Sequence, residues 1–183
     1  MPRLMMLSAC ILACAAPMSR DDDVDKPSDK VPQLKALAHC VGTWDVEFTS
    51  KDLPFARAKT TAKWVLDGRF VEQDNEVYDM NGAVALRVKT LFAFDASKNA
   101  YRSWTFVSDG WSGESDGVWD EKTRVMTFIA RKKEGEGFTT TTSDFSEEGV
   151  SSWKIAITDA DGKLAAEITG KNRRAKAPKP SKK

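Results

Sequence analysis

Short segments in which apolar and polar residues alternate run through most of this chain, and they constrain its fold more than any other feature. Trp44, Val46 and Phe48, for example, are each followed by a polar residue. This period of two is the pattern of a β-strand with one buried face and one wet face. Turn pairs such as Asn81-Gly82 separate the segments and favour tight hairpins. The pattern therefore predicts a succession of antiparallel strands.

About ten strands are expected, and most are joined by short turns. No segment after Trp44 has the length and period of a helix, whereas apolar residues recur at helical spacing between Leu34 and Val41. Short strands joined by tight turns favour a meander that closes on itself and so removes its edges. We therefore predict an all-β, antiparallel up-and-down barrel preceded by one short helix, with a two-sheet sandwich as the alternative. The expected strands lie near residues 44–48, 61–66, 70–78, 86–94, 101–108, 111–119, 125–131, 138–143, 153–158 and 164–169.

The third expected strand, residues 70–78, is polar on both faces. Alternation alone does not decide which of its faces looks inward, because a shift of one residue exchanges the two faces. The two sets that compete for the interior are Val71, Gln73, Asn75 and Val77, and Phe70, Glu72, Asp74 and Tyr78.

Length and composition fit one globular domain with a single core. The chain has 183 residues, and its six Trp and nine Phe supply bulky side chains for that core. The formal net charge is only +1, so no overall field favours binding to nucleic acid. We assign residues 33–174 to the barrel domain, and no feature predicts an oligomeric state.

The first 14 residues have the layout of an export signal. Arg3 is followed by the short apolar stretch Leu4–Leu12 and by small residues. Ile11-Leu12-Ala13-Cys14 resembles the lipobox of bacterial lipoproteins, in which the cysteine receives a lipid. We therefore expect Cys14 to anchor the protein to a membrane of the cell envelope. Leu7-Ser8-Ala9-Cys10 matches the lipobox pattern better, but Cys10 leaves too short an apolar stretch. Cleavage after Ala15 would instead give a soluble periplasmic or secreted protein.

Two polar segments flank the barrel domain. Residues 15–32 form the first segment, and their C-terminal part, residues 20–32, is rich in Asp, Lys, Ser and Pro. Residues 175–183 form the second, which is basic and contains two prolines. Neither segment can bury enough apolar surface to order itself. We expect the first to be a disordered tether and the second a disordered, solvated tail.

Gly42-x-Trp44, placed after a short helix at the start of the first strand, resembles the opening of the lipocalins and of the wider calycin group. The resemblance implies a calycin-like barrel in which Gly42 and Trp44 close one end. In lipocalins a basic residue near the end of the last strand packs across this Trp, a position that Lys171, Arg173 or Arg174 could take here.

The middle of the chain is similar to a bacterial domain-of-unknown-function family, number 1579. The similarity covers roughly residues 34–174 and implies a barrel without an established activity. The segments that carry it are Trp64-x-x-x-Gly68-Arg69-Phe70, Phe94-Asp95, Tyr101-Arg102-Ser103-Trp104, Asp109-Gly110 and Gly117-x-Trp119-Asp120.

The residues that common catalytic and metal sites require are scarce. His39 is the single histidine, and it precedes the barrel, so neither a zinc site nor a haem ligand late in the chain is expected. Glycine-rich phosphate loops and Gly-x-Ser-x-Gly elbows are absent from the sequence. Cys40 beside His39 is no dyad, because adjacent residues on a helix point in different directions. We therefore assign no catalytic residue, metal or cofactor and favour a protein that is not an enzyme.

The favoured functional hypothesis is a barrel cavity that binds a small apolar or amphipathic molecule. Aromatic residues and the polar third strand would supply its lining. The candidate lining residues are Trp64, Phe92, Trp104, Trp119, Glu72 and Gln73.

Two alternatives belong to other classes of protein. In the first, the barrel core is filled and Arg69, Arg102 and Trp111 face a protein partner at the barrel mouth. In the second, an enzyme acts on a lipid-like substrate with carboxylates buried inside the barrel or with Tyr101. The carboxylates considered are those of Glu72, Asp74, Glu114 and Asp116.

Overall fold

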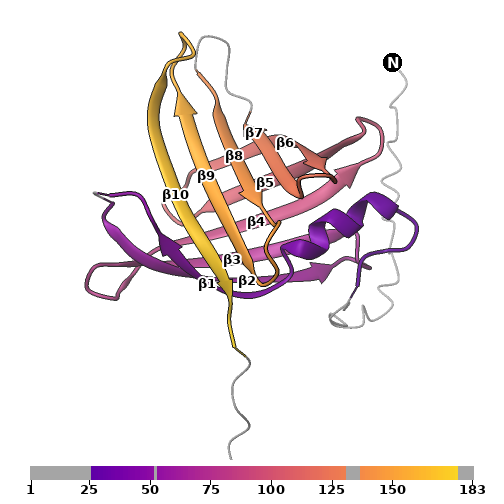
Figure 1. Ribbon diagram of the computed structural model, residues 1–183, viewed down its shortest axis with the longest axis horizontal. Coiled ribbons are helices and arrows are strands. Elements are labelled where there is room, and N and C mark those ends of the chain that lie inside the picture. Colours follow the sequence, from indigo (N-terminus) through magenta and orange to yellow (C-terminus); the bar gives the residue numbers. More distant parts are fainter. Residues whose placement is uncertain (1–25, 52, 131–136, 177–183) are drawn as a thin grey trace, which may run out of the picture.

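Ten antiparallel strands form a closed barrel in the computed structural model of the protein (Figure 1). The structure describes residues 26–51, 53–130 and 137–176. A short 3-10 helix, η1 (Pro32–His39), precedes the strands. The strands are β1 (Gly42–Phe48), β2 (Phe55–Val65), β3 (Phe70–Asp79), β4 (Val84–Asp95), β5 (Ala100–Val107), β6 (Ser112–Asp120), β7 (Val125–Ala130), β8 (Thr139–Asp144), β9 (Val150–Thr158) and β10 (Leu164–Arg174). The predicted all-β, up-and-down barrel is confirmed.

Pairing between the first and last strands closes the barrel. Each strand pairs with its neighbours in the sequence, and β1 pairs with β10, with Trp44 opposite Arg174 and Phe48 opposite Gly170. The sheet therefore has no free edge among the described strands, which excludes the sandwich alternative.

The helix η1 packs over one end of the barrel, here named the helix end. Leu34 and Leu37 of η1 are fully buried against inward-facing side chains such as Trp64 and Phe128. The hydroxyl of Tyr101 donates a hydrogen bond of 2.8 Å to the carbonyl oxygen of Gln33. The apolar face of η1, which helical spacing predicts, is therefore used to cover the barrel interior.

A second, smaller apolar cluster lies toward the far end of the barrel. Val46, Ala58 and Val77 are its buried members, and Phe48 and Trp153 pack against them. Because these side chains point inward from β1, β2, β3 and β9, they narrow the interior there.

The structure settles which face of β3 looks inward. Val71 and Val77 are buried, and Val71 pairs with the buried Trp64 on β2. The interior set is therefore Val71, Gln73, Asn75 and Val77, while Glu72 and Asp74 point outward. Pairing with a strand whose apolar face is unambiguous decides the register that the third strand itself leaves open.

The predicted flanking segments lie mostly outside the described residues. The export signal with Cys14, the tether up to residue 25 and the tail beyond residue 176 fall there. The last part of the expected tether lies against the barrel, where the amide of Ser28 donates a 3.0 Å hydrogen bond to the carbonyl oxygen of Gly68. The amide of Ala175 likewise bonds to the carbonyl oxygen of Thr43.

Candidate ligand-binding cavity

A cavity of about 290 Å³ lies inside the barrel between the two apolar clusters. Its wall is mostly apolar and includes rings from both clusters. This volume lies at the lower end of the range of small-molecule sites, which is about 300–1,000 Å³. The lining residues are Cys40, Trp44, Val46, Phe48, Ala58, Thr60, Gln73, Asn75, Val77, Val88, Phe92, Met126, Phe128, Thr141, Ser143, Phe145, Ser151, Trp153, Ile155 and Asn172.

No Asp, Glu, Lys, Arg or His is among the described residues that line this cavity. The one ionisable lining group is the thiol of Cys40, and burial raises its pKa to about 12, so the thiol is neutral at physiological pH. An ion inside the cavity would lose its hydration without gaining a counter-charge, which is strongly unfavourable. The cavity therefore suits an uncharged molecule.

Polar side chains of β2 and β3 form one wall of the cavity. The carbonyl oxygen of the Asn75 amide accepts hydrogen bonds from the Thr60 hydroxyl at 2.5 Å and from the Gln73 amide nitrogen at 3.4 Å. The Asn75 amide nitrogen donates to the backbone oxygen of Val88. Within the described residues, the carbonyl oxygen of the Gln73 side chain has no hydrogen-bond partner. It is an acceptor available to a ligand.

The wall formed by β9 and β10, which β1 separates from β2, carries a second polar group whose members are already paired. The indole nitrogen of Trp153 donates to the side-chain oxygen of Asn172 at 2.9 Å, and the Asn172 amide nitrogen donates to the Ser151 hydroxyl at 3.1 Å. The ring of Phe48 meets the Trp153 ring edge-on at 5.7 Å between centroids. These contacts fix the Trp153 ring as a rigid part of the wall.

Trp44 forms the helix-end wall of the cavity, as the lipocalin-like opening implies. Its indole nitrogen donates to the backbone oxygen of Cys40 at 2.9 Å. The guanidinium of Arg174 lies over the ring, 4.4 Å from its centroid, so of the three basic residues considered it is Arg174 that packs across the Trp. Gly42 has a φ of +126°, and a Cβ atom there would collide with the Arg174 guanidinium. The position accordingly favours glycine on two grounds.

The six candidate lining residues are not brought together. Phe92 and Gln73 line the cavity. Trp64 is buried in the apolar cluster beneath η1. Trp119 also lies at the helix end, where its ring stacks on His39 at 5.3 Å and its indole nitrogen donates to Glu121.

Trp104 and Glu72 lie on the outer surface of the barrel, so neither lines the cavity. Ser103, next to Trp104 in β5, is buried and pairs with the inward Phe92, so strand alternation turns Trp104 outward. The Trp104 ring packs against the Arg102 guanidinium at 5.3 Å. Glu72 pairs with Lys89 at 3.2 Å.

The four carboxylates considered for acid–base chemistry also lie on the outer surface. Lys89 is 2.9 Å from Asp74, and Arg102 is 2.9 Å from Asp116 and also pairs with Glu114. Each of the four carboxylates thus has a basic partner outside the barrel. The enzyme alternative that places them inside the barrel is therefore wrong in its geometry.

The three residues of the interaction-module alternative do not share one surface. Arg69 lies in the loop between β2 and β3 at the helix end, Arg102 is on the outer wall, and Trp111 is 56% exposed in the β5–β6 turn at the far end. A single partner at the barrel mouth would not contact all three.

Several polar lining residues were missed in the sequence, namely Asn75, Thr141, Ser143, Ser151 and Asn172. The signal that could have found Asn75 is its spacing, since it lies two residues after Gln73 and shares its face. Thr141 and Ser143 lie on β8, where residues 139–143 are all Thr or Ser, and Ser151 and Asn172 each have a polar neighbour on the other face of the strand, so alternation carries little information there.

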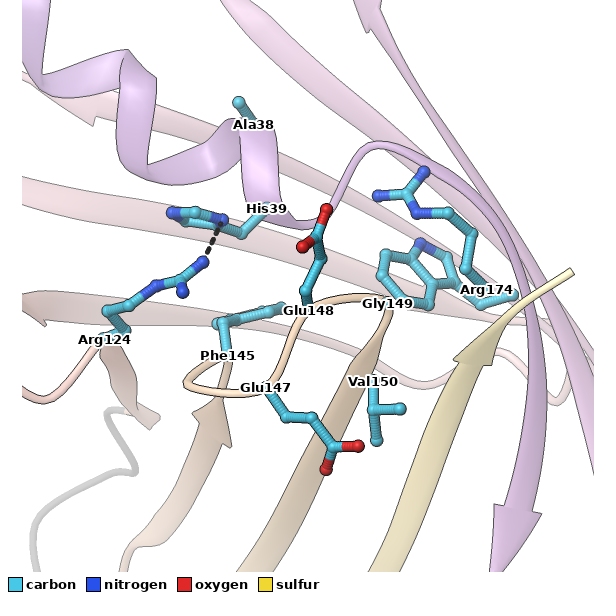
Figure 2. Close-up of a pocket in the computed structure, with 10 residues that line it drawn as sticks. Ala38, His39, Arg124, Phe145, Glu147, Glu148, Gly149, Val150 and Arg174 are labelled. Atoms are coloured by element: carbon cyan, nitrogen blue, oxygen red, sulfur yellow. Dashed lines mark hydrogen bonds between the residues drawn. The ribbon is translucent and has the colours of Figure 1, made fainter.

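A second cavity, of about 520 Å³, lies at the helix end outside the barrel (Figure 2). We name it the helix-end cleft. Trp44 and Phe145 line both the cleft and the barrel cavity and so form the wall between them. The residues that line the cleft are Ala38, His39, Trp44, Arg124, Phe145, Glu147, Glu148, Gly149, Val150 and Arg174.

His39 is held at the side of this cleft by rings and by an arginine. Its ring stacks on Phe145 at 5.7 Å, and the Arg124 guanidinium donates to His39 Nδ1 at 3.4 Å. Burial, and then the positive charge of Arg124, lower the pKa of His39, while Glu121 acts in the opposite direction. The lowered pKa agrees with a neutral ring that accepts this hydrogen bond.

Neither a membrane-spanning helix nor a metal-ligand cluster is found in the part of the chain that the structure describes. No helix there has the length and apolar character needed to cross a bilayer. No three His, Cys, Asp or Glu residues there come together as a metal site would require.

Comparison with known proteins shows a likeness in fold. No family model and no curated protein sequence matches the chain. The chain is similar in structure to Rv2717c from M. tuberculosis, with a TM-score of 0.59 and 10% sequence identity over 80% of this chain and 99% of that one. Likeness at this identity establishes the barrel fold alone.

Proposed function

We propose that the barrel cavity binds a small uncharged molecule that is largely apolar and carries one hydrogen-bonding group. The observation that supports this most directly is a largely apolar wall in which the described residues include no charged side chain. The free carbonyl oxygen of Gln73 offers an acceptor to a hydroxyl or amide hydrogen of the ligand. The proposal thus narrows the expected class of ligand, from any apolar or amphipathic molecule to an uncharged one whose polar group lies beside β3.

A matched pair of ligands tests the charge requirement. Octanol and octanoate have the same chain length, but octanoate is ionised at pH 7. We expect octanol to bind and octanoate to bind at least about tenfold more weakly, since the carboxylate finds no counter-charge in the cavity. Titration calorimetry with the full chain measures both. Equal binding of the two, or tighter binding of octanoate, contradicts the proposal.

Two variants, with a third as their control, test whether the ligand lies inside the barrel. Gln73→Leu removes the free acceptor and should weaken octanol binding about tenfold, the size expected for an unpaired polar group on the ligand. Glu72→Gln changes the neighbouring outward residue and should leave binding unchanged. Val88→Phe reduces the cavity volume and should weaken binding too, with thermal unfolding as the check that the barrel remains intact.

Native mass spectrometry of the full chain, purified gently from its source, identifies the natural ligand. A stoichiometric additional mass that is lost on denaturation supports the proposed function and gives the ligand's chemical class. A charged natural ligand located in the barrel would contradict it.

Export and lipid anchoring through Cys14 are proposed on the N-terminal sequence. Labelling of growing bacterial cells with radioactive palmitate should mark the wild-type chain and the Cys10→Ser variant but not the Cys14→Ser variant. Labelling that is lost in Cys10→Ser instead would identify Cys10 as the lipidated residue. An unlabelled chain released to the periplasm would favour cleavage after Ala15. Membership of family 1579 is likewise a proposal that rests on the sequence motifs alone.

A further inference from the structure

The helix-end cleft differs from the barrel cavity in carrying charges of both signs. It is bounded by Ala38 and His39 at the end of η1 and, across from them, by the loop between β8 and β9 that holds Glu147 and Glu148 (Figure 2). Its volume of about 520 Å³ lies within the range of small-molecule sites. The cleft is therefore large enough to hold a ligand of its own.

Among the described residues, the positive charges of the cleft are held by contacts other than ion pairs. Arg174 lies over the Trp44 ring, and Arg124 donates to His39 Nδ1. A neutral histidine contributes no negative charge, so the charge of Arg124 is not compensated by this contact. Hydrogen bonds from Ser146 are the main cause of the lowered pKa of Asp144, and the charge of Arg124 contributes to it, but no carboxylate of the described residues forms an ion pair with Arg124 or Arg174. Both guanidinium groups therefore remain available to an anionic group in the cleft.

The negative charges of the cleft are also unpaired. Within the described residues, neither Glu147 nor Glu148 has a basic group within 4.0 Å of its carboxylate. The Glu148 carboxylate points toward the helix side of the cleft, whereas that of Glu147 points the opposite way (Figure 2). Glu148 is thus the carboxylate placed to meet a cationic group.

Apolar surface lies between these charges. Trp44 and Phe145 are buried, with 4% and 8% of their surfaces exposed, and Val150 adds an aliphatic side chain. Opposite charges held apart around apolar surface are complementary to a molecule that carries both charges and an apolar group between them.

We propose that the helix-end cleft binds a small zwitterion of the size of an amino acid or dipeptide, with its carboxylate on Arg124 and its ammonium group on Glu148. The apolar side chain of the ligand lies against Phe145 and Trp44. This site is separate from the barrel cavity and does not depend on the function proposed for it.

The dipeptide alanyl-leucine is the probe, and acetyl-alanyl-leucine amide is the control of nearly the same shape without charges. The full chain is titrated with each peptide, and binding is followed by NMR through the amide and indole resonances of Trp44. Only the free dipeptide should show saturable binding. Glu148→Gln and Arg124→Gln should each weaken it about tenfold. Glu147→Gln, on the same loop, and Gln73→Leu, in the barrel, should leave it unchanged.

Three results would each overturn the proposal. These are equal binding of the free and blocked dipeptides, no saturable binding of alanyl-leucine up to about 10 mM, and equal weakening by Glu147→Gln and Glu148→Gln. The first two use the wild-type chain and so do not depend on the folding of a variant. If the dipeptide does not bind the cleft but octanol binds in the barrel, the cleft site is rejected and the function proposed for the barrel cavity is not.

Discussion

Gly42 illustrates how a single residue determines the helix end of the barrel. Its φ of +126° lies in the region that favours glycine, and the missing Cβ leaves room for the Arg174 guanidinium. Through Arg174 and Trp44 this glycine supports the wall between the cleft and the cavity.

Gly42→Ala should therefore lower the free energy of unfolding by about 2–4 kcal/mol, from backbone strain together with loss of the cation–π contact. Gly82→Ala is the matched control, because Gly82 also has a positive φ but no atom lies within 4 Å of the place that its Cβ would take. It should lower the free energy by only about 1–2 kcal/mol. Urea unfolding measures both, and equal losses would show that the contact with Arg174 contributes nothing.

His39 offers a second test at this scale, because it is the only histidine of the chain and its NMR titration is unambiguous. Arg124→Gln should raise the pKa of His39 by removing a positive charge, and Glu121→Gln should lower it by removing a negative one. Burial is the largest cause of the lowered pKa, so Arg124→Gln should restore it only in part. Shifts of the same sign in both variants would contradict this account.

The same group makes stability depend on pH in a defined direction. Because the pKa of His39 is lower in the folded state than its usual 6.5, the unfolded chain binds the proton first as the pH falls. The contribution of neutral His39 to stability is complete above about pH 6.5 and is lost as the pH falls through the folded pKa. Arg124→Gln should weaken this dependence.

At the scale of elements, the strands make room for aromatic rings by placing glycines on their inward faces. Gly117 of β6 lies under the Phe128 ring, Gly113 of the same strand lies under Trp111, and Gly170 of β10 lies under Trp153. A ring can cover the backbone at these positions because no Cβ intervenes. Phe128 and Trp153 thus fit inside a narrow barrel.

Gly117→Ala and Gly113→Ala form a matched pair on β6. A Cβ at residue 117 would lie 2.5 Å from the buried Phe128 ring, and one at residue 113 would lie 2.6 Å from the Trp111 ring, which is 56% exposed. Trp111 can move into solvent and Phe128 cannot. Gly117→Ala should destabilise the protein by about 1–3 kcal/mol and Gly113→Ala by no more than about 0.5 kcal/mol. Similar losses in thermal unfolding would contradict this explanation.

At the scale of the whole molecule, the barrel depends on pairing between the two ends of the chain. β1 contributes one partner of the closing pair and β10, about 120 residues later, the other, as in the hydrogen bond from Thr49 to Thr169. Every strand between them is paired on both sides. Removal of either terminal strand therefore leaves two unpaired edges.

A chain ending at Asp161 lacks β10 and should aggregate, because the exposed edges of β1 and β9 can pair with other copies. A chain ending at Lys176 keeps all of β10 and is the control. Size-exclusion chromatography and thioflavin fluorescence compare the two. A monomeric, folded product without β10 would show that closure is not needed for solubility.

The sequence by itself determined the class of fold and the number of strands, because alternation and turn pairs are local signals that recur in almost every strand. The resemblance of Gly42-x-Trp44 to a lipocalin opening also predicted that these two residues close one end of the barrel. Phe92 and Gln73 were predicted at the cavity from local composition, and the structure places both there.

Only the tertiary structure decided which side chains meet. The face of β3 followed from its pairing with β2, and the outward positions of Trp104 and Glu72 followed from their neighbours Ser103 and Val71. The helix-end cleft joins residues from η1, the β6–β7 and β8–β9 loops and the end of β10. Strand pairing over long distances in the chain sets these relations, and the period of one strand contains no information about its partner's register.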